Sequence, residues 1–292
     1  MIEQQWLAEQ FDAHRGHLRG VAYRMLGSSS EAEDAVQNAW LKVSRADVES
    51  VDNLGGWLTT VVARVCLDML RTRKSRREES LDEPAVSAPR SGRIPSDPEQ
   101  ETLLADSVGV ALLVVLNTLE PAERLAFVLH DMFGMPFEEI GPVVGRTPAA
   151  ARQLASRARR RVRGSPAIEA TELARQRQVV EAFLSAVRAG DFEGLLAVLD
   201  PDVVVRLDAA AGAAGGPREI RGARRWAQGA LAFSRAVHGA EAALVNGTVG
   251  VVLAPRGRLF RALQFRIKDG KIAEVEVIAD ARRLNQLEIA AL

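Results

Sequence analysis

Apolar residues recur at helical spacing over residues 1 to about 77, and no alternating strand pattern interrupts them. Ser30 and Glu33 form a capping-box pair, which predicts a helix from Glu31 to about Ser44. A second apolar stripe predicts a helix from about Asn53 to Arg73, with Trp57 facing the core. The first part of the chain is therefore expected to be all-α.

A stretch rich in Pro, Ser and charged residues, 78–97, follows and has the composition of a linker. Pro98 then marks the start of a helix that is expected to run to Asn117. Pro121 and Pro136 open two more helices in the same way.

A helix-turn-helix is predicted at the end of this second helical part. A tight turn, Gly145–Thr147, separates a short helix that contains Pro142 from a longer one. Thr147 is the expected N-cap of the longer helix, and Pro148 is its expected first residue. The apolar stripe of that helix is predicted to comprise Ala150, Leu154, Ala158 and Val162.

The pattern changes after about Glu172 to a mixture of helices and strands. Asp269-Gly270 is a typical hairpin turn and joins the last two strand-like runs. The segment is therefore expected to be an α+β domain. Its expected helices cover 179–190, 191–199 and about 223–237, and its strand-like runs are 203–209, 242–254, 259–270 and 271–280.

Length and composition suit a multidomain globular protein, because the chain has 292 residues, of which 47% are hydrophobic and 26% are charged. Two all-α domains and one α+β domain are expected. The predicted boundaries are 1–77, a linker at 78–97, 98–165 and 170–292.

The charge is zero overall but is locally uneven. Five cations lie between Arg71 and Arg77, and seven arginines without any acid lie between Arg146 and Arg163. Phosphate neutralisation supplies most sequence-independent affinity for DNA, and here it is limited to two patches. We therefore expect DNA contact that depends on a larger partner.

The longer helix of the helix-turn-helix carries a polar face suited to DNA. In the major groove, arginine pairs with guanine and glutamine with adenine, while cations further along reach phosphates. The predicted DNA-contacting residues of this helix are Arg152, Gln153, Ser156, Arg157 and Arg160, with Arg159, Arg161 and Arg163 near phosphates.

Several other classes of site are not expected. The single cysteine, Cys66, excludes an internal disulfide and a cysteine-based zinc site. His14 and His17 lack a cluster of acids or thiols, so no metal and no cofactor is predicted. Because neither a secretory signal nor an apolar stretch of about 20 residues is found, a cytoplasmic protein with no membrane partner is expected.

The order of the motifs resembles regions two and four of an extracytoplasmic-function (ECF) sigma factor of the sigma-70 family. The resemblance covers residues 1 to about 165 and rests on EAEDAVQNAWLKV, GGWLTTVVARVCLDMLRTRKSRR and RQLASRARRRVR. It implies an alternative sigma factor that directs promoter-specific transcription initiation. Core RNA polymerase and promoter DNA would be its partners, with residues 1–77 as region two and 98–165 as region four.

The same resemblance assigns roles to single residues. In the family, the first motif docks on the polymerase clamp helices, which implies polymerase-binding residues Asp34, Gln37, Asn38, Trp40 and Leu41. The second motif reads the promoter minus-ten element as melted single strand, which implies Asn53, Arg64, Asp68, Arg71, Arg73 and Lys74. Region four of the family reads the minus-thirty-five element, which adds Thr147 to the predicted DNA-contacting residues.

Residues 179–208, VVEAFLSAVRAGDFEGLLAVLDPDVVVRLD, resemble a SnoaL-like cone-shaped α+β domain. In sigma factors of this class, such a domain is similar to a built-in regulator that acts in cis. Enzymes of this fold use a pocket acid or a histidine together with hydrogen-bond donors, for which Asp208, Trp226 and His238 are the candidates. Their spacing does not show that they converge, so catalysis is not expected, and an unidentified small ligand is left open.

Two further classes of protein explain less of the chain. A stand-alone helix-turn-helix regulator with a ligand domain leaves residues 1–77 without a role. A fusion enzyme rests on the fold of the C-terminal segment alone, and a fold does not transmit function.

Overall fold

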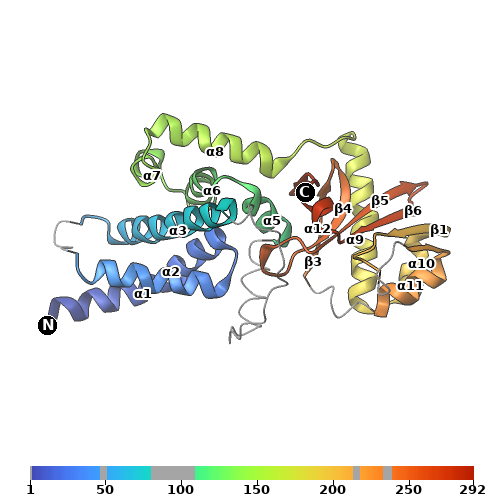
Figure 1. The fold of residues 1–292 in the computed structure, drawn as a ribbon, viewed down its shortest axis with the longest axis horizontal. Helices are drawn as coiled ribbons and strands as arrows, with labels where there is room; N and C mark the ends of the chain where they lie inside the picture. Colours follow the sequence, from blue (N-terminus) through green and yellow to red (C-terminus); the bar gives the residue numbers. More distant parts are fainter. Residues whose placement is uncertain (1, 47–50, 80–108, 213–217, 233–238) are drawn as a thin grey trace. The chain divides into compact units, whose positions relative to one another are not determined.

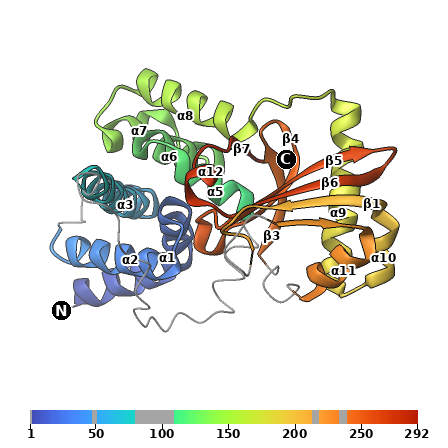
Figure 2. The same cartoon turned by 45° about the vertical axis from the view of Figure 1, so that its right-hand side comes forward.

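The structure is a computed structural model and describes residues 2–46, 51–79, 109–212, 218–232 and 239–292. The chain forms two compact units, shown in Figures 1 and 2. Unit 1 comprises Met1–Ser107 and Leu116–Arg160, and unit 2 comprises Val108–Val115 and Arg161–Leu292. Most of the predicted linker, 80–97, and the predicted helix start at Pro98 lie outside the described residues.

Three long helices form the first part of unit 1 and bury Leu18, Tyr23, Leu58 and Leu67 between them. The N-cap of the second helix is Ser28, whose hydroxyl accepts from the Glu31 N–H at 3.5 Å. The predicted cap at Ser30 is therefore wrong, because Ser30 already lies inside the helix. The helices are α1 (Ile2–Leu26), α2 (Ser29–Val43) and α3 (Leu54–Glu79).

Helix α3 continues past Arg73, where the sequence pattern predicted its end. The segment RTRKSRR contains neither glycine nor proline, and arginine and lysine are good helix formers. The basic stretch therefore lies on a helix surface.

The second part of unit 1 contains the predicted helix-turn-helix. Pro121 opens its helix as expected, and Pro136 directly precedes the next one. Thr147 caps the last helix through its hydroxyl, which accepts from the Ala150 N–H at 3.2 Å. The elements are α5 (Val110–Thr118), α6 (Pro121–Phe127), the π-helical η2 (Val128–Met132), α7 (Phe137–Val144) and α8 (Pro148–Arg163).

The buried stripe of α8 differs from the predicted one. Ala151, Ala155 and Ala158 are fully buried, whereas Ala150 and Leu154 are only half-buried. Because several neighbouring residues near the start of α8 are alanines, the sequence allows more than one face of this helix to be the buried one. Only packing against the other helices selects which face is buried. The consequence is that Arg152, Gln153, Ser156, Arg157 and Arg160 all remain exposed.

Unit 2 is built on a seven-stranded sheet in the order β2-β1-β6-β5-β4-β3-β7. The β1–β6 pair is parallel and the other pairs are antiparallel. The strands are β1 (Leu199–Leu207), β2 (Arg218–Arg221), β3 (Ala240–Val245), β4 (Thr248–Leu253), β5 (Arg261–Lys268), β6 (Lys271–Ile278) and β7 (Ile289–Ala290).

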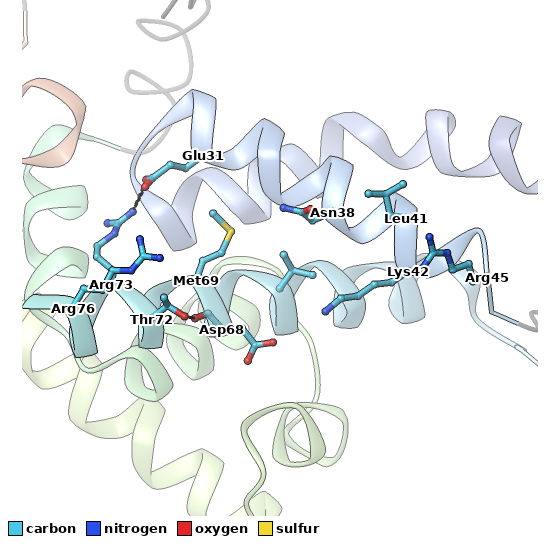
Figure 3. Close-up of a pocket in the computed structure, with 11 residues that line it drawn as sticks. Glu31, Asn38, Leu41, Lys42, Arg45, Asp68, Met69, Thr72, Arg73 and Arg76 are labelled. Atoms are coloured by element: carbon cyan, nitrogen blue, oxygen red, sulfur yellow. Dashed lines mark hydrogen bonds and ion pairs between the residues drawn. The ribbon is translucent and has the colours of Figure 1, made fainter. Parts of the chain in front are cut away.

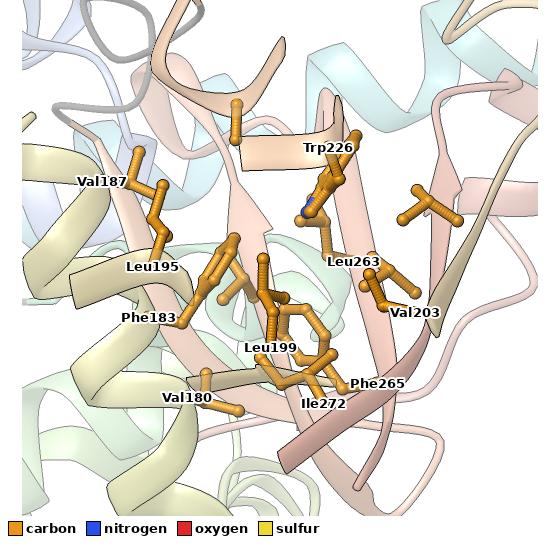
Figure 4. Close-up of a cluster of buried hydrophobic side chains, with 14 of the residues drawn as sticks. Val180, Phe183, Val187, Leu195, Leu199, Val203, Trp226, Leu263, Phe265 and Ile272 are labelled. Atoms are coloured by element: carbon orange, nitrogen blue, oxygen red, sulfur yellow. The ribbon is translucent and has the colours of Figure 1, made fainter. Parts of the chain in front are cut away.

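Helices cover one face of this sheet and enclose the main core of unit 2, drawn in Figure 4. Alternate strand residues point to opposite faces, so Val251 joins this core whereas Val252 packs on the other face against Ala111 of α5. The helices of unit 2 are α9 (Ala170–Ala189), α10 (Phe192–Val198), α11 (Ala223–Ala232) and α12 (Ala281–Leu284), and a 3₁₀ turn η4 (Pro255–Gly257) follows β4.

Two details of the predicted α+β domain need correction. The run 242–254 is a hairpin rather than one strand, because Asn246 and Gly247 both adopt positive φ (52° and 80°) and turn the chain. The short elements β2, β7 and α12 were not predicted. The hairpin turn at Asp269-Gly270 is confirmed, with φ values of 51° and 73°.

Candidate nucleic-acid interface

A groove of about 860 Å³ runs between α2 and α3 and is shown in Figure 3. Val65, Met69 and Leu41 supply its apolar lining. Four cations border it, against two acids: Lys42, Arg45, Arg73 and Arg76, with Glu31 and Asp68. The groove thus combines a net positive rim with an apolar floor, which suits a strand of nucleic acid with unstacked bases.

The predicted minus-ten residues all belong to α3 or its cap. Asn53 caps the helix, because its side-chain oxygen accepts from the Gly56 N–H at 3.0 Å. Arg64, Asp68 and Arg71 are exposed at spacings of four and three residues, so they share one face of α3.

Arg73 and Lys74 are exposed or half-exposed but already have acidic partners. Arg73 pairs with Glu31 at 2.5 Å, and Lys74 pairs with Glu120 at 2.7 Å. These acids were missed from sequence because they lie 42 and 46 residues away from their partners.

The predicted minus-thirty-five residues lie on the exposed face of α8. The Arg152 guanidinium stacks over the Phe137 ring at 5.2 Å, and Arg157 Nε donates to Glu123 Oε1 at 2.9 Å. Gly141 allows the close turn between α7 and α8, since a Cβ there would lie 2.9 Å from the Arg146 carbonyl oxygen. The turn and these two side-chain contacts therefore hold α8 against α6 and α7.

The five predicted polymerase-binding residues gather on α2. Trp40 is half-buried and its ring packs on Phe11 with centroids 5.0 Å apart. A hollow of about 650 Å³ between α1 and α2 is lined in part by Gln37, Trp40 and Leu41. Leu41 is 55% exposed, and Asp34, Gln37 and Asn38 are exposed beside it.

The proposed acid of unit 2, Asp208, has its carboxylate occupied by structural hydrogen bonds. Its oxygens accept from the N–H groups of Ala211, Ala279 and Asp280, each at 2.9 Å. Desolvation raises the pKa of Asp208, but these donors and Arg283 outweigh it and the net pKa lies below the ordinary value. Asp208 is a loop-fixing carboxylate that does not suit a general base.

Trp226 lies in the main core of unit 2, 8% exposed, and is labelled in Figure 4. His238, the third candidate of the enzyme reading, lies outside the described residues.

Other features of the described residues bear on site chemistry. No group of three or more His, Cys, Asp or Glu residues that could hold a metal occurs among them. Burial raises the pKa of the Cys66 thiol to about 12, so this cysteine is protonated in the folded protein. Within the described ranges, every helix is too short or too polar to cross a membrane.

Comparison with known families matches three segments of the chain. The family described as Sigma-70 region 2 matches residues 10–76, and the one described as Sigma-70, region 4 matches residues 109–162. The family described as SnoaL-like domain matches residues 180–275.

Similar proteins extend over almost the whole chain. The probable ECF RNA polymerase sigma factor SigI of Mycobacterium tuberculosis is 36% identical over 281 residues, which cover 94% of this chain and 93% of SigI. The ECF RNA polymerase sigma factor SigJ of the same organism is 38% identical over 288 residues, covering 93% and 91%. The crystal structure of SigJ aligns over 95% of this chain and 98% of SigJ, with 31% identity and a TM-score of 0.44.

The region 2 match contains the basic groove, the region 4 match contains the helix-turn-helix, and the SnoaL-like match contains most of the sheet. With full-length relatives of more than 30% identity, the chain belongs to the ECF RNA polymerase sigma factors.

Proposed function

We propose that this alternative sigma factor binds core RNA polymerase through α2 and reads promoter DNA with α3 and α8. The observation that carries the proposal is the exposed polar face of α8, held above a buried alanine stripe behind a tight turn. Such a helix can enter a major groove while α7 crosses the backbone. Association with the polymerase places the protein in the cytoplasm.

Region two is proposed to hold the minus-ten element as single strand. Arg64 and Arg71 lie on one exposed face of α3, and the groove beside it combines cations with an apolar floor. Cations follow the phosphates while extruded bases find apolar contacts. Asn53 caps the same helix, and Asp52, Asn53 and the first turn of α3 up to Gly56 are proposed to hold a flipped base.

The polymerase contact is proposed to centre on Leu41. An exposed leucine beside a half-buried tryptophan, surrounded by Asp34, Gln37 and Asn38, has the composition of an interface core with a polar rim. The five residues are those that the family resemblance assigns to the clamp helices.

The test is promoter-dependent transcription with purified core polymerase. The full chain should give specific transcripts from its own promoter, and Leu41→Asp should abolish polymerase binding without unfolding unit 1. Ala13→Asp, which adds the same charge at an exposed position of α1 outside the hollow, is the matched control for solubility and folding. Tight, specific duplex binding by the chain alone, with no transcription on addition of the polymerase, would favour a stand-alone regulator.

For the C-terminal domain we propose modulation in cis without substrate turnover. Helix α5, the first described helix of region four, begins in unit 2 and ends in unit 1. Its first turn has no acid of its own, and Glu241 on β3 accepts from the Ala111 N–H at 2.8 Å. The domain therefore supplies the cap of a region-four helix, which is worth about 1 kcal/mol.

Glu241→Ala in the full chain tests this modulation better than truncation, because a chain ending near Arg163 loses the cap together with the whole packing face of Ala111. We expect the variant to change promoter output severalfold at equal polymerase occupancy, whereas Glu193→Ala on α10 should not. Equal output from Glu241→Ala and the wild type across several promoters and salt concentrations would refute the cis effect.

A further inference from the structure

The ring of Phe137, the first residue of α7, contacts two cationic or aromatic side chains. The imidazole of His130 stacks on it, with centroids 3.9 Å apart and an interplanar angle of 29°. The guanidinium carbon of Arg152 on α8 lies over the same ring, 5.2 Å from its centroid. Phe137 is 6% exposed, whereas Arg152 is exposed. A buried ring at the start of α7 therefore supports an exposed arginine of the neighbouring helix, which lies beside α7 in both views (Figures 1 and 2).

The position of this ring is set by the short connection between η2 and α7. His130 lies in η2, and its Nδ1 donates to the Met135 carbonyl at 3.0 Å. The Met135 N–H in turn donates to the Leu129 carbonyl at 2.9 Å. Pro136, which directly precedes Phe137, has a φ of −69° that its own ring restricts. The backbone on both sides of the stacked rings is thus fixed without any contribution from DNA.

Arg152 is supported differently from two other arginines of α8. Arg157 pairs with Glu123 at 2.9 Å. Arg159 pairs with Asp131 at 2.8 Å. Within the described ranges, Arg152 has the Phe137 ring as its support and no acidic partner. An acid offsets the positive charge and occupies N–H donors, whereas a ring beneath the guanidinium leaves the charge and the in-plane donors available for another partner.

A support of this kind favours the reading of a base over general attraction to DNA. A free arginine side chain loses rotamer freedom when it is fixed against a base, and this loss weakens binding. Cation–π attraction already restricts the guanidinium before DNA arrives. Two parallel hydrogen bonds to guanine also require one orientation of the guanidinium plane, whereas a contact to phosphate tolerates several. The benefit of the ring is therefore greatest at a base pair that arginine reads.

We propose that Phe137 is a positioning residue for promoter recognition. Its ring holds Arg152 in the direction that pairs with a guanine of the minus-thirty-five element, and His130 holds the ring. The proposal rests on the function proposed above, in which α8 enters the major groove. Because Phe137 is buried, it acts through Arg152, and its influence falls on the single base pair that Arg152 reads.

The test is competition binding of the full chain with core polymerase to promoters that differ by one base pair in the minus-thirty-five element. Arg152→Ala identifies the base pair whose preference depends on this arginine. Phe137→Leu should lower discrimination at that base pair about fivefold and leave the other positions unchanged. Phe127→Leu is the matched control, since Phe127 of α6 is similarly buried, at 7%, and no cation of the described residues lies over its ring. It should leave every preference unchanged.

Two further variants separate positioning from a purely structural role. Phe137→Leu should have no additional effect on discrimination in a chain that already carries Arg152→Ala, because the side chain that it positions is gone. Phe137→Tyr retains the ring and should restore the wild-type preference. If Phe137→Leu fails to fold by circular dichroism, His130→Leu decides, since His130 is half-buried and this change removes the support of the ring while Phe137 stays in place. The same base pair should then lose discrimination.

A folded Phe137→Leu or His130→Leu variant with wild-type discrimination would overturn the positioning role. So would equal losses at every base pair, a loss that persists in the Arg152→Ala background, or an Arg152→Ala variant with all its base preferences intact. A wild-type complex with core polymerase that selects no promoter at all would instead refute the proposed function.

Discussion

Arg157 on the exposed face of α8 is held by Glu123, whose carboxylate lies 9% exposed at the start of α6, 34 residues earlier in the chain. Glu123 thereby fixes the direction of a side chain that is predicted to read DNA. A residue of the predicted DNA-contacting face is thus positioned by a buried acid of another helix.

The first prediction concerns this pair. Arg157→Ala leaves a buried carboxylate without its guanidinium partner and should lower the free energy of unfolding by about 1–2 kcal/mol. Glu123→Gln together with Arg157→Ala should recover much of that loss, because no buried charge remains. Urea unfolding of the four members of the double-mutant cycle measures the coupling, and strictly additive losses would contradict it.

Base readout and phosphate contact should separate along α8. Arg152→Ala or Gln153→Ala is expected to cost about 1–3 kcal/mol at particular minus-thirty-five bases, whereas Arg161→Ala should weaken all sequences alike. Competition binding of the polymerase complex to matched and scrambled promoters distinguishes the two. Equal losses on both promoters for the first pair would mean that another face of region four contacts the bases.

Gly141→Ala should destabilise the helix-turn-helix by about 1–3 kcal/mol, because the new Cβ would meet the backbone of the turn at Arg146 and Pro148 (2.9 and 3.1 Å). Gly16→Ala in α1 is the control, since nothing lies within 4 Å of the added Cβ. It should be neutral or stabilising by up to about 1 kcal/mol. Thermal unfolding of both variants makes the comparison, and equal midpoints would contradict it.

His17 should make the stability of unit 1 depend on pH. Desolvation, with help from the nearby charges of His14 and Arg24, lowers the pKa of His17 from its ordinary value of 6.5. The unfolded chain therefore takes up the proton first, so stability is full above about pH 6.5 and falls as the pH drops through the folded pKa. His17→Gln, which can still bond Thr59, should flatten the urea midpoint between pH 5 and 7.

Asp208 should contribute stability rather than chemistry. Asp208→Ala removes the acceptor of three backbone N–H groups and should lower the free energy of unfolding of unit 2 by about 2–3 kcal/mol. Because its folded pKa lies below the ordinary 3.8, the contribution is present above that pH and is lost as the pH falls through the folded value. An unchanged acid limb of the stability curve in Asp208→Asn would contradict this assignment.

Local signals in the sequence were sufficient for much of the fold. Pro121, Thr147 and the Asp269-Gly270 turn each restrict the backbone within a few residues, and the structure places the helix starts and the hairpin where they predict. The exposed face of α8 was also predicted in outline, because its charged side chains stay in solvent whichever of the neighbouring alanines are buried.

By itself, the sequence determined the two helical parts, the covered sheet and the basic faces, since propensity, capping and periodicity act over one or two turns. Only the tertiary structure decided which cations have acidic partners and which strands complete the sheet edges. Lys74 meets Glu120 and Arg124 reaches Arg24 across 46 and 100 residues, and β7 is two residues long. No local preference encodes such contacts, because they form only when packing brings distant segments within hydrogen-bond distance.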